Sequence, residues 1–542
     1  MIKVIPLSSL VKVFSDEEPA AKPFDRVSCL TNEKVQLQVA FCSDNDCDID
    51  IKVESKIKDN IKLYWVEEIY SKNPVHILQD DYTLRKKSGY FPELLRPLDG
   101  TFSAKSGKWN SVWLEIIPQP ENKAGLQTIS VVLSCGDTIE KVQFNIDVID
   151  AKLPEQKLIN TNWFHTDCIA THYGVEVFSD KYWEYVKNFL QVAVDYGMNM
   201  VLTPLFTPPL DTKVGKERPT VQLVGVKLEK DKYTFDFANL NKWIAMCEEV
   251  GIKYFELSHL FTQWGAKKCP KIMANVDGEQ KRIFGWDTKA SGKKYRNFLT
   301  AFAEAFKPYL KEKGLEDKVY FHVSDEPFAA VVRHYRKASK IVSELFGEYK
   351  IMDALSNIKF YNKGLVKLPV PANDHIEPFI GVVPDLWTYY CCVQVKGVSN
   401  KFFSMPSQRN RVLGYQMYKY NVKGFLHWGY NFWYKQFSVG PVDPFTETDA
   451  GGSFPSGDSF VVYPGVDGKP LQSLRLKVFY DGFQDMRACQ LLEDLVGKDK
   501  VMSIIEEGVT PITFASFPHS DEWQLGVREK INMAIKEALS NK

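Results

Sequence analysis

The sequence contains no run of about 18 apolar residues, the length that a membrane-spanning helix needs. Residues 1–6 show neither the apolar stretch nor the small-residue cleavage site of a secretory signal. We therefore expect no membrane partner and a cytoplasmic location. If the sequence is that of a trimmed mature chain, we expect a secreted or surface location instead.

Neither sign of charge predominates in the chain. Lysine and arginine number 68, aspartate and glutamate number 68, and no run of basic residues stands out. A neutral chain has no general electrostatic attraction to nucleic acid or to an anionic bilayer. We therefore expect no nucleic-acid partner.

Several motifs that would identify other classes of protein are missing. The ten cysteines form no C-x-x-C pair, which excludes the usual zinc knuckles, and scattered cysteines of this kind are typical of buried thiols in a reducing compartment. No P-loop supports phosphoryl transfer, and no G-x-S-x-G elbow supports a serine hydrolase. We expect no cofactor.

The first 150 residues carry the signals of an all-β domain. Apolar and polar residues alternate, as strands require, in several short runs separated by turn-forming residues. These runs are residues 35–41, 111–116, 128–133 and 142–148. They predict an N-terminal β-sandwich over residues 1–150, with residues 79–100 as a long loop.

After residue 150, short apolar runs alternate with longer segments of helical periodicity, which is typical of βα units. The predicted strands are residues 158–164, 198–203, 252–257, 319–323, 351–355, 366–370, 386–391 and 425–430. Eight such units predict an α/β fold with a (β/α)8 TIM barrel over residues 151–495. A doubly wound open sheet is the alternative, but no glycine-rich phosphate turn follows these strands. Residues 496–542 are predicted to form a C-terminal helical extension.

Two adjacent carboxyl groups follow one of the predicted strands. Asp325 and Glu326 come directly after residues 319–323, and the barrel fold places chemistry at such strand ends. Repulsion between two such groups should raise one pKa and leave the other group ionised. The same Ser-Asp-Glu-Pro segment would also make a good helix start, because acidic residues are favourable there.

The adjacency of this pair constrains the mechanism. Neighbouring side chains of a strand point to opposite faces, so both reach one ligand only if the backbone leaves the strand, which Pro327 encourages. Standard glycosidases place their carboxyl groups on either side of the scissile bond. An adjacent pair better fits the exception in which a 2-acetamido oxygen of the substrate attacks C1. One carboxylate would orient that group and the other would protonate the leaving oxygen.

Other polar and aromatic residues lie at or near the ends of the predicted strands, where rings could stack on sugar and polar groups could bind hydroxyls. The candidate substrate-binding residues are His165, Asp167, His259, Trp264, Tyr389, Trp428, Tyr430 and Asn431. Period two would put Trp428 and Tyr430 on the same face. For any single aromatic residue, core packing is the alternative interpretation. His165, Asp167, His172 and His259 match no metal-site spacing, so no metal is predicted.

These residues resemble a known family. The segment 324–327 resembles the Asp-Glu pair of glycoside hydrolase family 123, the β-N-acetylgalactosaminidases. Residues 386–392 and 424–431 resemble the related domain of unknown function 4091. The resemblance covers residues 150 to 490 and implies a β-sandwich followed by a (β/α)8 barrel.

The resemblance also implies an activity, which is retaining, substrate-assisted cleavage of terminal β-linked N-acetylgalactosamine from a glycan or glycoconjugate. Asp325 would orient the acetamido group, and Glu326 would be the general acid and base. Two alternatives stay open. A glycosidase for a sugar without the acetamido group would need a separate nucleophile, with Glu256 or Asp353 as candidates. A degenerate barrel could bind carbohydrate without cleaving it.

Overall fold

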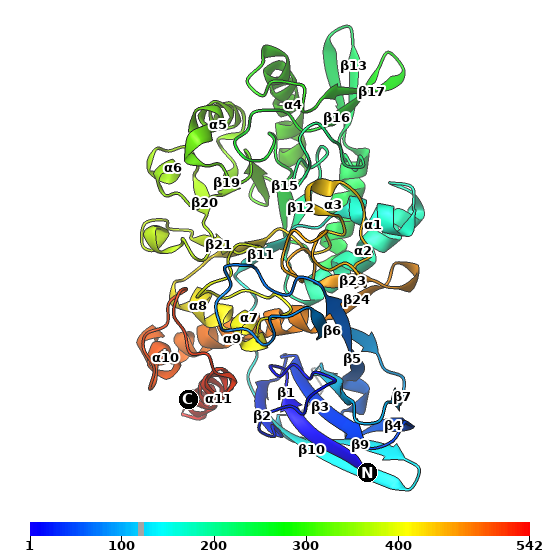
Figure 1. Cartoon of the computed structure of the whole chain (residues 1–542). Helices are drawn as coiled ribbons and strands as arrows, with labels where there is room; N and C mark the ends of the chain where they lie inside the picture. The colour runs from blue at the N-terminus through cyan, green and yellow to red at the C-terminus, as the bar shows by residue number, and fades with distance from the viewer. Residues whose placement is uncertain (118–123, 542) are drawn as a thin grey trace.

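The computed structural model describes residues 1–117 and 124–541. All eight strands predicted between residues 158 and 430 are present, and they form one sheet (Figure 1). In spatial order these strands are β20 (Leu368–Val370), β19 (Lys350–Ala354), β18 (Val319–His322), β15 (Tyr254–Leu257), β12 (Met200–Thr203), β11 (Ile159–Asn162), β22 (Gly424–His427) and β21 (Trp387–Tyr389).

The eight strands form a nearly closed parallel barrel. Every neighbouring pair in the sheet is parallel. Its two ends meet where the backbone N–H of Asn373 donates to the carbonyl of Tyr389 at 2.8 Å and the N–H of Tyr389 donates to Pro371 at 3.1 Å. The interior is filled by side chains such as Met200, Tyr320 and Leu426. The barrel is therefore a packed core whose free space lies at the strand ends.

Helices follow most of the barrel strands, as the periodicity predicts. They are α1 (Thr166–Tyr173), α2 (Asp180–Asp195), α3 (Ala238–Val250), α4 (Lys293–Glu312), α5 (Val332–Phe346), α6 (Lys359–Asn362), α7 (Ser407–Arg411), α8 (Leu413–Lys419) and α9 (Leu474–Val496). In α4, Phe298, Phe302 and Phe306 recur at helical spacing and are all buried. This apolar stripe holds the helix against the outside of the barrel.

Two hairpins extend from the barrel without a counterpart in the sequence-based prediction. They form a four-stranded sheet seen at the top of Figure 1. Its strands are β13 (Gly225–Glu229), β14 (Lys232–Asp236), β16 (Ile272–Val276) and β17 (Glu279–Phe284). They are insertions between barrel strands and helices, which the barrel fold tolerates in its loops.

The N-terminal region is all-β and contains two sheets. The five-stranded sheet has the order β2 (Arg26–Leu30), β10 (Thr138–Ile149), β9 (Gly125–Cys135), β4 (Cys47–Glu54) and β7 (Thr101–Ala104). The other has the order β1 (Ile2–Ser8), β3 (Val35–Ser43), β8 (Trp109–Ile116), β5 (Ile61–Ser71), β6 (Gly89–Pro97), β24 (Pro470–Ser473) and β23 (Val462–Pro464). Buried residues of both sheets, such as Val39 and Phe144, share one apolar cluster.

This second sheet differs from the sequence-based expectations at two places. β6 lies inside residues 79–100, which were expected to form a loop. β24, which comes late in the predicted barrel segment, pairs with β6, and β23 pairs with β24, so both strands belong to the N-terminal sheet. Pairing between segments so far apart in sequence leaves no local signal.

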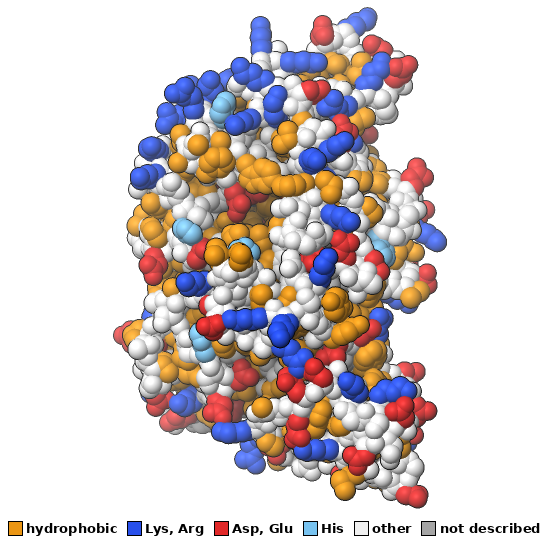
Figure 2. Space-filling model, viewed as in Figure 1, with side chains coloured by type: hydrophobic (Ala, Val, Ile, Leu, Met, Phe, Trp, Pro, Cys, Tyr) orange, Lys and Arg blue, Asp and Glu red, His pale blue; other side chains and the backbone are white. Residues whose placement is uncertain are grey.

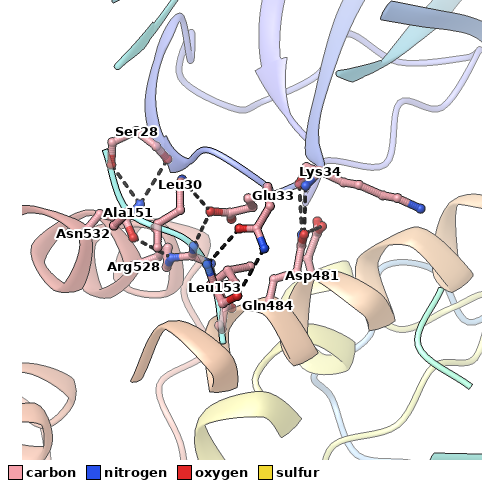
Figure 3. A network of polar contacts seen from close by, with 12 residues as sticks. Ser28, Leu30, Glu33, Lys34, Ala151, Leu153, Asp481, Gln484, Arg528 and Asn532 are labelled. Carbon is pink, nitrogen blue, oxygen red and sulfur yellow. Dashed lines mark hydrogen bonds and ion pairs between the residues drawn. The ribbon is translucent and has the colours of Figure 1, made fainter. Parts of the chain in front are cut away.

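The C-terminal helices are joined to the N-terminal sheets by buried polar contacts (Figure 3). α10 (Lys498–Ile505) and α11 (Asp521–Ser540) follow α9. Arg528 of α11 donates to Glu33 at 2.5 Å and to Asp485 of α9 at 2.9 Å, and Asn532 donates to the carbonyl of Ser28 at 3.1 Å. These paired, buried charges fix α11 against the sheet, because separating them would leave a charge uncompensated.

The surface agrees with the balanced composition. Basic and acidic side chains are interspersed over the face seen in Figure 2. Among the helices of the described residues, none has the length and apolarity that crossing a bilayer requires.

Candidate active site

Asp325 and Glu326 follow β18 in a turn that leaves the strand. Glu326 has a left-handed backbone, with φ of 40°, which is costly for a residue with a side chain. Its N–H donates to the carbonyl of Ala354 at 3.1 Å, and the carbonyl of Asp325 accepts from the N–H of Trp264 at 2.9 Å. Because the chain turns here, both side chains line the same pocket. The departure from the strand that the pair requires is therefore confirmed.

The pocket lies at the ends of the barrel strands and has a volume of about 840 Å³, including its opening to solvent. Figure 2 shows a recess on this face, where acidic and hydrophobic side chains are exposed together. The pocket is lined by Trp163, His165, Leu210, Asp211, Gln263, Trp264, Asp325, Glu326, Ala354, Tyr389, Cys391, Cys392, Leu426, Trp428, Gln436 and Phe454.

The two carboxyl groups are half-buried in the pocket wall and influence each other. Burial raises the pKa of Glu326, while the hydroxyl of Tyr389, which donates to its Oε1 at 2.5 Å, acts in the opposite direction. Burial and then the negative charge of Glu326 raise the pKa of Asp325, and the nearby His322 opposes that rise. Such a pair loses its protons in two separate steps. It can therefore hold one proton for transfer while it carries one negative charge.

A buried chain of charged groups lies outside the pocket, next to the carboxyl pair. His322 contacts Glu256 through Nε2 at 2.7 Å and Asp353 through Nδ1 at 3.2 Å, and the three side chains are inaccessible to solvent. Burial alone would lower the pKa of His322, but hydrogen bonds to Asp353 and Glu256 outweigh it and raise the pKa to about 9. His322 is therefore a cation at neutral pH.

This chain also fixes the strand end that leads to the pair. Asp353 accepts the backbone N–H groups of Val323 at 3.0 Å and Ser324 at 3.2 Å. Glu256 accepts the indole N–H of the pocket residue Trp163 at 2.7 Å. Neither Glu256 nor Asp353 lines the pocket. Their second oxygens accept the hydroxyls of Thr161 and Tyr335, so neither is placed to be the separate nucleophile of the alternative mechanism.

His165 lines the pocket with both ring nitrogens already bonded. Its Nδ1 accepts from Arg218 at 3.0 Å, and its Nε2 donates to the carbonyl of Trp428 at 2.9 Å. Burial and then the Arg218 charge lower the pKa of His165 to about 3, so the ring is neutral. It can offer a ring surface to a ligand, but it has no free nitrogen for a hydroxyl group.

Two other predicted residues support His165 and do not line the pocket. The side chain of Asn431 accepts the N–H of His165 at 2.8 Å and donates to its carbonyl at 3.1 Å. Asp167 forms a two-pronged ion pair with Arg218 at 2.9 and 2.8 Å. The sequence places both residues near a strand end. It does not reveal that Arg218, 51 residues away from Asp167, forms an ion pair with Asp167.

Tyr430 lies in the core and not in the pocket. Its hydroxyl donates to the carbonyl of Phe189 at 3.0 Å, and its ring stacks on Phe164. β22 ends at His427, so the alternation expected to align Tyr430 with Trp428 stops before it reaches either residue. Trp428 does line the pocket, as do Trp264 and Tyr389.

His259 is also outside the pocket. It is buried and stacks on His322 with 4.1 Å between the ring centres. In the described part of the chain neither of its ring nitrogens has a hydrogen-bond partner. His259, His322 and Asp353 lie close enough together to be compared with a metal site. The donor set does not fit one well, because both nitrogens of His322 are bonded to carboxylates and the two rings are stacked.

Several pocket residues had no signal in the sequence-based prediction. Trp163 lies in a predicted strand but was not distinguished from core aromatics. Cys391 and Cys392 belong to no cysteine motif that would indicate a role in a site. Asp211, Gln263, Gln436 and Phe454 lie in loops, where no periodicity identifies the residues that face a ligand. The signal for Asp211 is that it is the first carboxyl residue after the predicted strand 198–203.

Comparisons with known proteins agree with this geometry. The model of the glycoside hydrolase 123 catalytic domain matches residues 163–492. No curated protein sequence matches the chain. Among solved structures, the chain is similar to a family 123 glycoside hydrolase from Clostridium perfringens whose title concerns glycolipid glycan hydrolysis. That match has a TM-score of 0.77 at 15% identity and covers 100% of this chain and 98% of the other.

Two further structures match much more weakly. A β-glucuronidase from Parabacteroides merdae has a TM-score of 0.32 at 11% identity, covering 84% of this chain and 50% of that one. A family 20 exo-β-N-acetylglucosaminidase from Vibrio harveyi has a TM-score of 0.25 at 8% identity, covering 78% of this chain and 90% of that one. We draw nothing from either of them.

Proposed function

Since the chain belongs to glycoside hydrolase family 123 and is a glycoside hydrolase, we propose that it removes terminal β-linked N-acetylgalactosamine from glycans, with retention of configuration. The proposed route is substrate-assisted and passes through an oxazolinium intermediate. The proposed substrate is a glycan or glycoconjugate, and the C. perfringens enzyme, described as acting on glycolipid glycans, suggests one source to test.

The observation that carries this proposal is the placement of the carboxyl pair. Asp325 and Glu326 are consecutive and line one pocket from the same turn. Ordinary retaining enzymes need two carboxyl groups about 5–5.5 Å apart, flanking the scissile bond. Consecutive residues on one wall cannot easily flank a bond. A nucleophile supplied by the substrate removes that requirement.

The two carboxyl groups then have different roles. Glu326 transfers its proton to the leaving oxygen as the acetamido oxygen of the substrate bonds to C1 and the glycosidic bond breaks. Asp325 accepts the acetamido N–H and stabilises the positive charge of the ring that forms. Glu326 then removes a proton from the water that attacks C1, which restores the acetamido group and releases the sugar.

The pocket walls suit a sugar at the end of a chain. Trp163, Trp264, Tyr389, Trp428 and Phe454 present aromatic surface, on which the C–H face of a pyranose can pack. The buried chain of Glu256, His322 and Asp353 fixes the turn that carries the acids. We propose Trp428 and Tyr389 as the rings nearest the sugar.

Two proposals concern the rest of the chain. The two N-terminal sheets are proposed to form a β-sandwich domain over residues 1–150, before a barrel at residues 151–495 and a helical extension at 496–542. The protein is proposed to work in a reducing compartment, the cytoplasm. The ten free cysteines, five of them buried, support that proposal.

An inhibitor comparison tests the proposed mechanism. The enzyme should hydrolyse aryl β-N-acetylgalactosaminides, and a thiazoline that mimics the cyclised acetamido intermediate should inhibit it strongly. The matched aryl β-galactoside, which lacks the acetamido group, should not be cleaved. If the galactoside is cleaved and the thiazoline has no effect, the enzyme uses a separate nucleophile. Binding without cleavage of any glycan would instead support a carbohydrate-binding protein.

A further inference from the structure

A third carboxyl group, Asp211, faces the pocket from a different wall. It lies in the loop after β12, two strands away from β18 in the barrel, and its side chain lines the pocket. Its Oδ2 accepts the N–H of Phe437 at 2.9 Å, and its carbonyl accepts the hydroxyl of Ser438 at 2.7 Å. Two loops from distant parts of the sequence therefore fix the position of this carboxyl group.

The backbone of Asp211 is strained, as it is at two other pocket residues. Asp211 has φ of 39°, Trp264 has 57° and Glu326 has 40°. Each of these left-handed conformations costs free energy in a residue with a side chain, and such conformations gather at functional sites. The strain at Asp211 turns its carboxyl group toward the pocket that Glu326 also faces.

The carboxyl group of Asp211 retains a free acceptor. Within residues 1–117 and 124–541, its Oδ1 has no hydrogen-bond donor, and the nearby Arg218 is engaged by Asp167. Burial raises the pKa of Asp211 to about 6, against the effect of the Phe437 N–H. The group is therefore mostly ionised at neutral pH and can accept hydrogen bonds from hydroxyl groups.

Several other polar groups on the pocket walls are already bonded. The nitrogens of His165 are taken up, Glu326 accepts from Tyr389, and the indole N–H of Trp428 donates to Asp458 at 2.9 Å. A sugar whose C1 and acetamido group lie at the carboxyl pair still has to place its other hydroxyl groups. Asp211 is a charged acceptor that reaches the pocket from a different loop, near enough to the pair for its charge to raise the pKa of Asp325.

We propose that Asp211 binds ring hydroxyls of the terminal sugar from its own wall of the pocket, and so determines which epimer the enzyme accepts. This inference rests on the proposed function, because it assumes that the acetamido group lies at Asp325 and Glu326. Hydrogen bonds to a charged group discriminate strongly, since a substrate that lacks the hydroxyl leaves the buried carboxylate unpaired.

The test combines a protein change with a substrate change. Asp211→Asn keeps an oxygen that can accept the Phe437 N–H but removes the charge. Asp443→Asn is the matched control, because Asp443 also accepts a backbone N–H, from Phe445 at 3.0 Å, and does not line the pocket. The substrates are the aryl β-N-acetylgalactosaminide, its C4 epimer, and its 3-, 4- and 6-deoxy analogues.

The expected results concern the wild type and both variants. Asp211→Asn should raise KM about 10- to 100-fold while kcat changes less than about tenfold, and the preference between the C4 epimers should fall toward one. Removing the bound hydroxyl should cost the wild type about 10- to 100-fold in kcat/KM. The same removal should cost Asp211→Asn less than about threefold, because the interaction is already lost. Asp443→Asn should behave as the wild type.

The contrary results separate the possible failures. If every deoxy substrate lowers kcat/KM by the same factor in Asp211→Asn as in the wild type, Asp211 binds none of these hydroxyls. The inference is then wrong, whatever the mechanism. If Asp211→Asn loses turnover by more than about a thousandfold and azide restores it, Asp211 is the nucleophile, and both proposals fail. If the wild type cleaves only sugars without the acetamido group, the proposed function fails. The deoxy comparison on those sugars still decides the role of Asp211. If Asp211→Asn is misfolded by circular dichroism, Asp211→Ser replaces it in the same comparison.

Discussion

The hydroxyl of Tyr389 donates a hydrogen bond of 2.5 Å to Oε1 of Glu326. Tyr389 is the last residue of β21, whereas Glu326 lies in the turn after β18, so the bond crosses the mouth of the barrel. The backbone of Tyr389 is itself hydrogen-bonded to the backbones of Pro371 and Asn373, where the barrel closes. The closure of the sheet thus helps to fix the position of Glu326, the proposed proton donor.

Tyr389→Phe is expected to raise the pKa of Glu326, because the lost hydrogen bond stabilises the ionised carboxylate. Glu326 must be protonated to begin the reaction, so the alkaline limb of the kcat/KM profile should move to higher pH. Turnover at neutral pH should fall about tenfold as the carboxyl group loses its orientation. A pH–rate profile of the two proteins measures both effects. An unchanged alkaline limb would mean that the limb does not report Glu326.

His322 is expected to make stability depend on alkaline pH. Its pKa is about 9 in the folded protein and about 6.5 when unfolded. The stabilisation is therefore complete below pH 6.5 and is lost as pH rises through 9, a change of about 3 kcal/mol. The groups around the ring are Glu256 of β15, Asp353 of β19, the stacked His259 and the neighbouring Asp325.

Urea unfolding of wild type and His322→Asn between pH 6 and 9 measures the contribution of His322 to the free energy of unfolding. The variant should be less stable by about 3–5 kcal/mol at pH 6, because it leaves two buried carboxylates without their cation. The difference between the two proteins should shrink as pH rises. A difference that is constant with pH would show that His322 is neutral in the folded protein.

Trp428 and Tyr430 should respond differently although they are two residues apart. Trp428→Ala removes a pocket wall and should raise KM about tenfold or more, with the fold retained. Tyr430→Phe removes a buried hydrogen bond to Phe189 and should cost about 1 kcal/mol of stability with unchanged kinetics. Steady-state kinetics with thermal unfolding of both variants checks this. A raised KM for Tyr430→Phe alone would contradict the placement of the two rings.

The sequence predicted the parts of this site that depend on local patterns. Short apolar runs located all eight barrel strands, and the strand end located Asp325 and Glu326 because chemistry in barrels occurs there. His165, Trp264, Tyr389 and Trp428 were placed at the site for the same reason, and all four line the pocket. The resemblance to family 123 is confirmed by the family model.

The rest depends on contacts between distant residues. Asp167 was expected to bind substrate, but it pairs with Arg218, and no local pattern reveals that a charge will be neutralised in the core. Asp211 is brought to the pocket by its bond to Phe437, 226 residues later. The pairing of β24 with β6 joins segments far apart in sequence, and propensity carries no information about such pairs.

The most direct test of the central claim compares wild type, Asp325→Asn and Glu326→Gln on two β-N-acetylgalactosaminides, one with a nitrophenyl and one with a dinitrophenyl leaving group. Substrate-assisted catalysis by this pair predicts a loss of about a hundredfold in both variants on the nitrophenyl substrate. Glu326→Gln should recover much of the loss on the dinitrophenyl substrate, which needs no proton to leave, whereas Asp325→Asn should not. Wild-type rates in both variants, or turnover confined to sugars without the acetamido group, would contradict the claim.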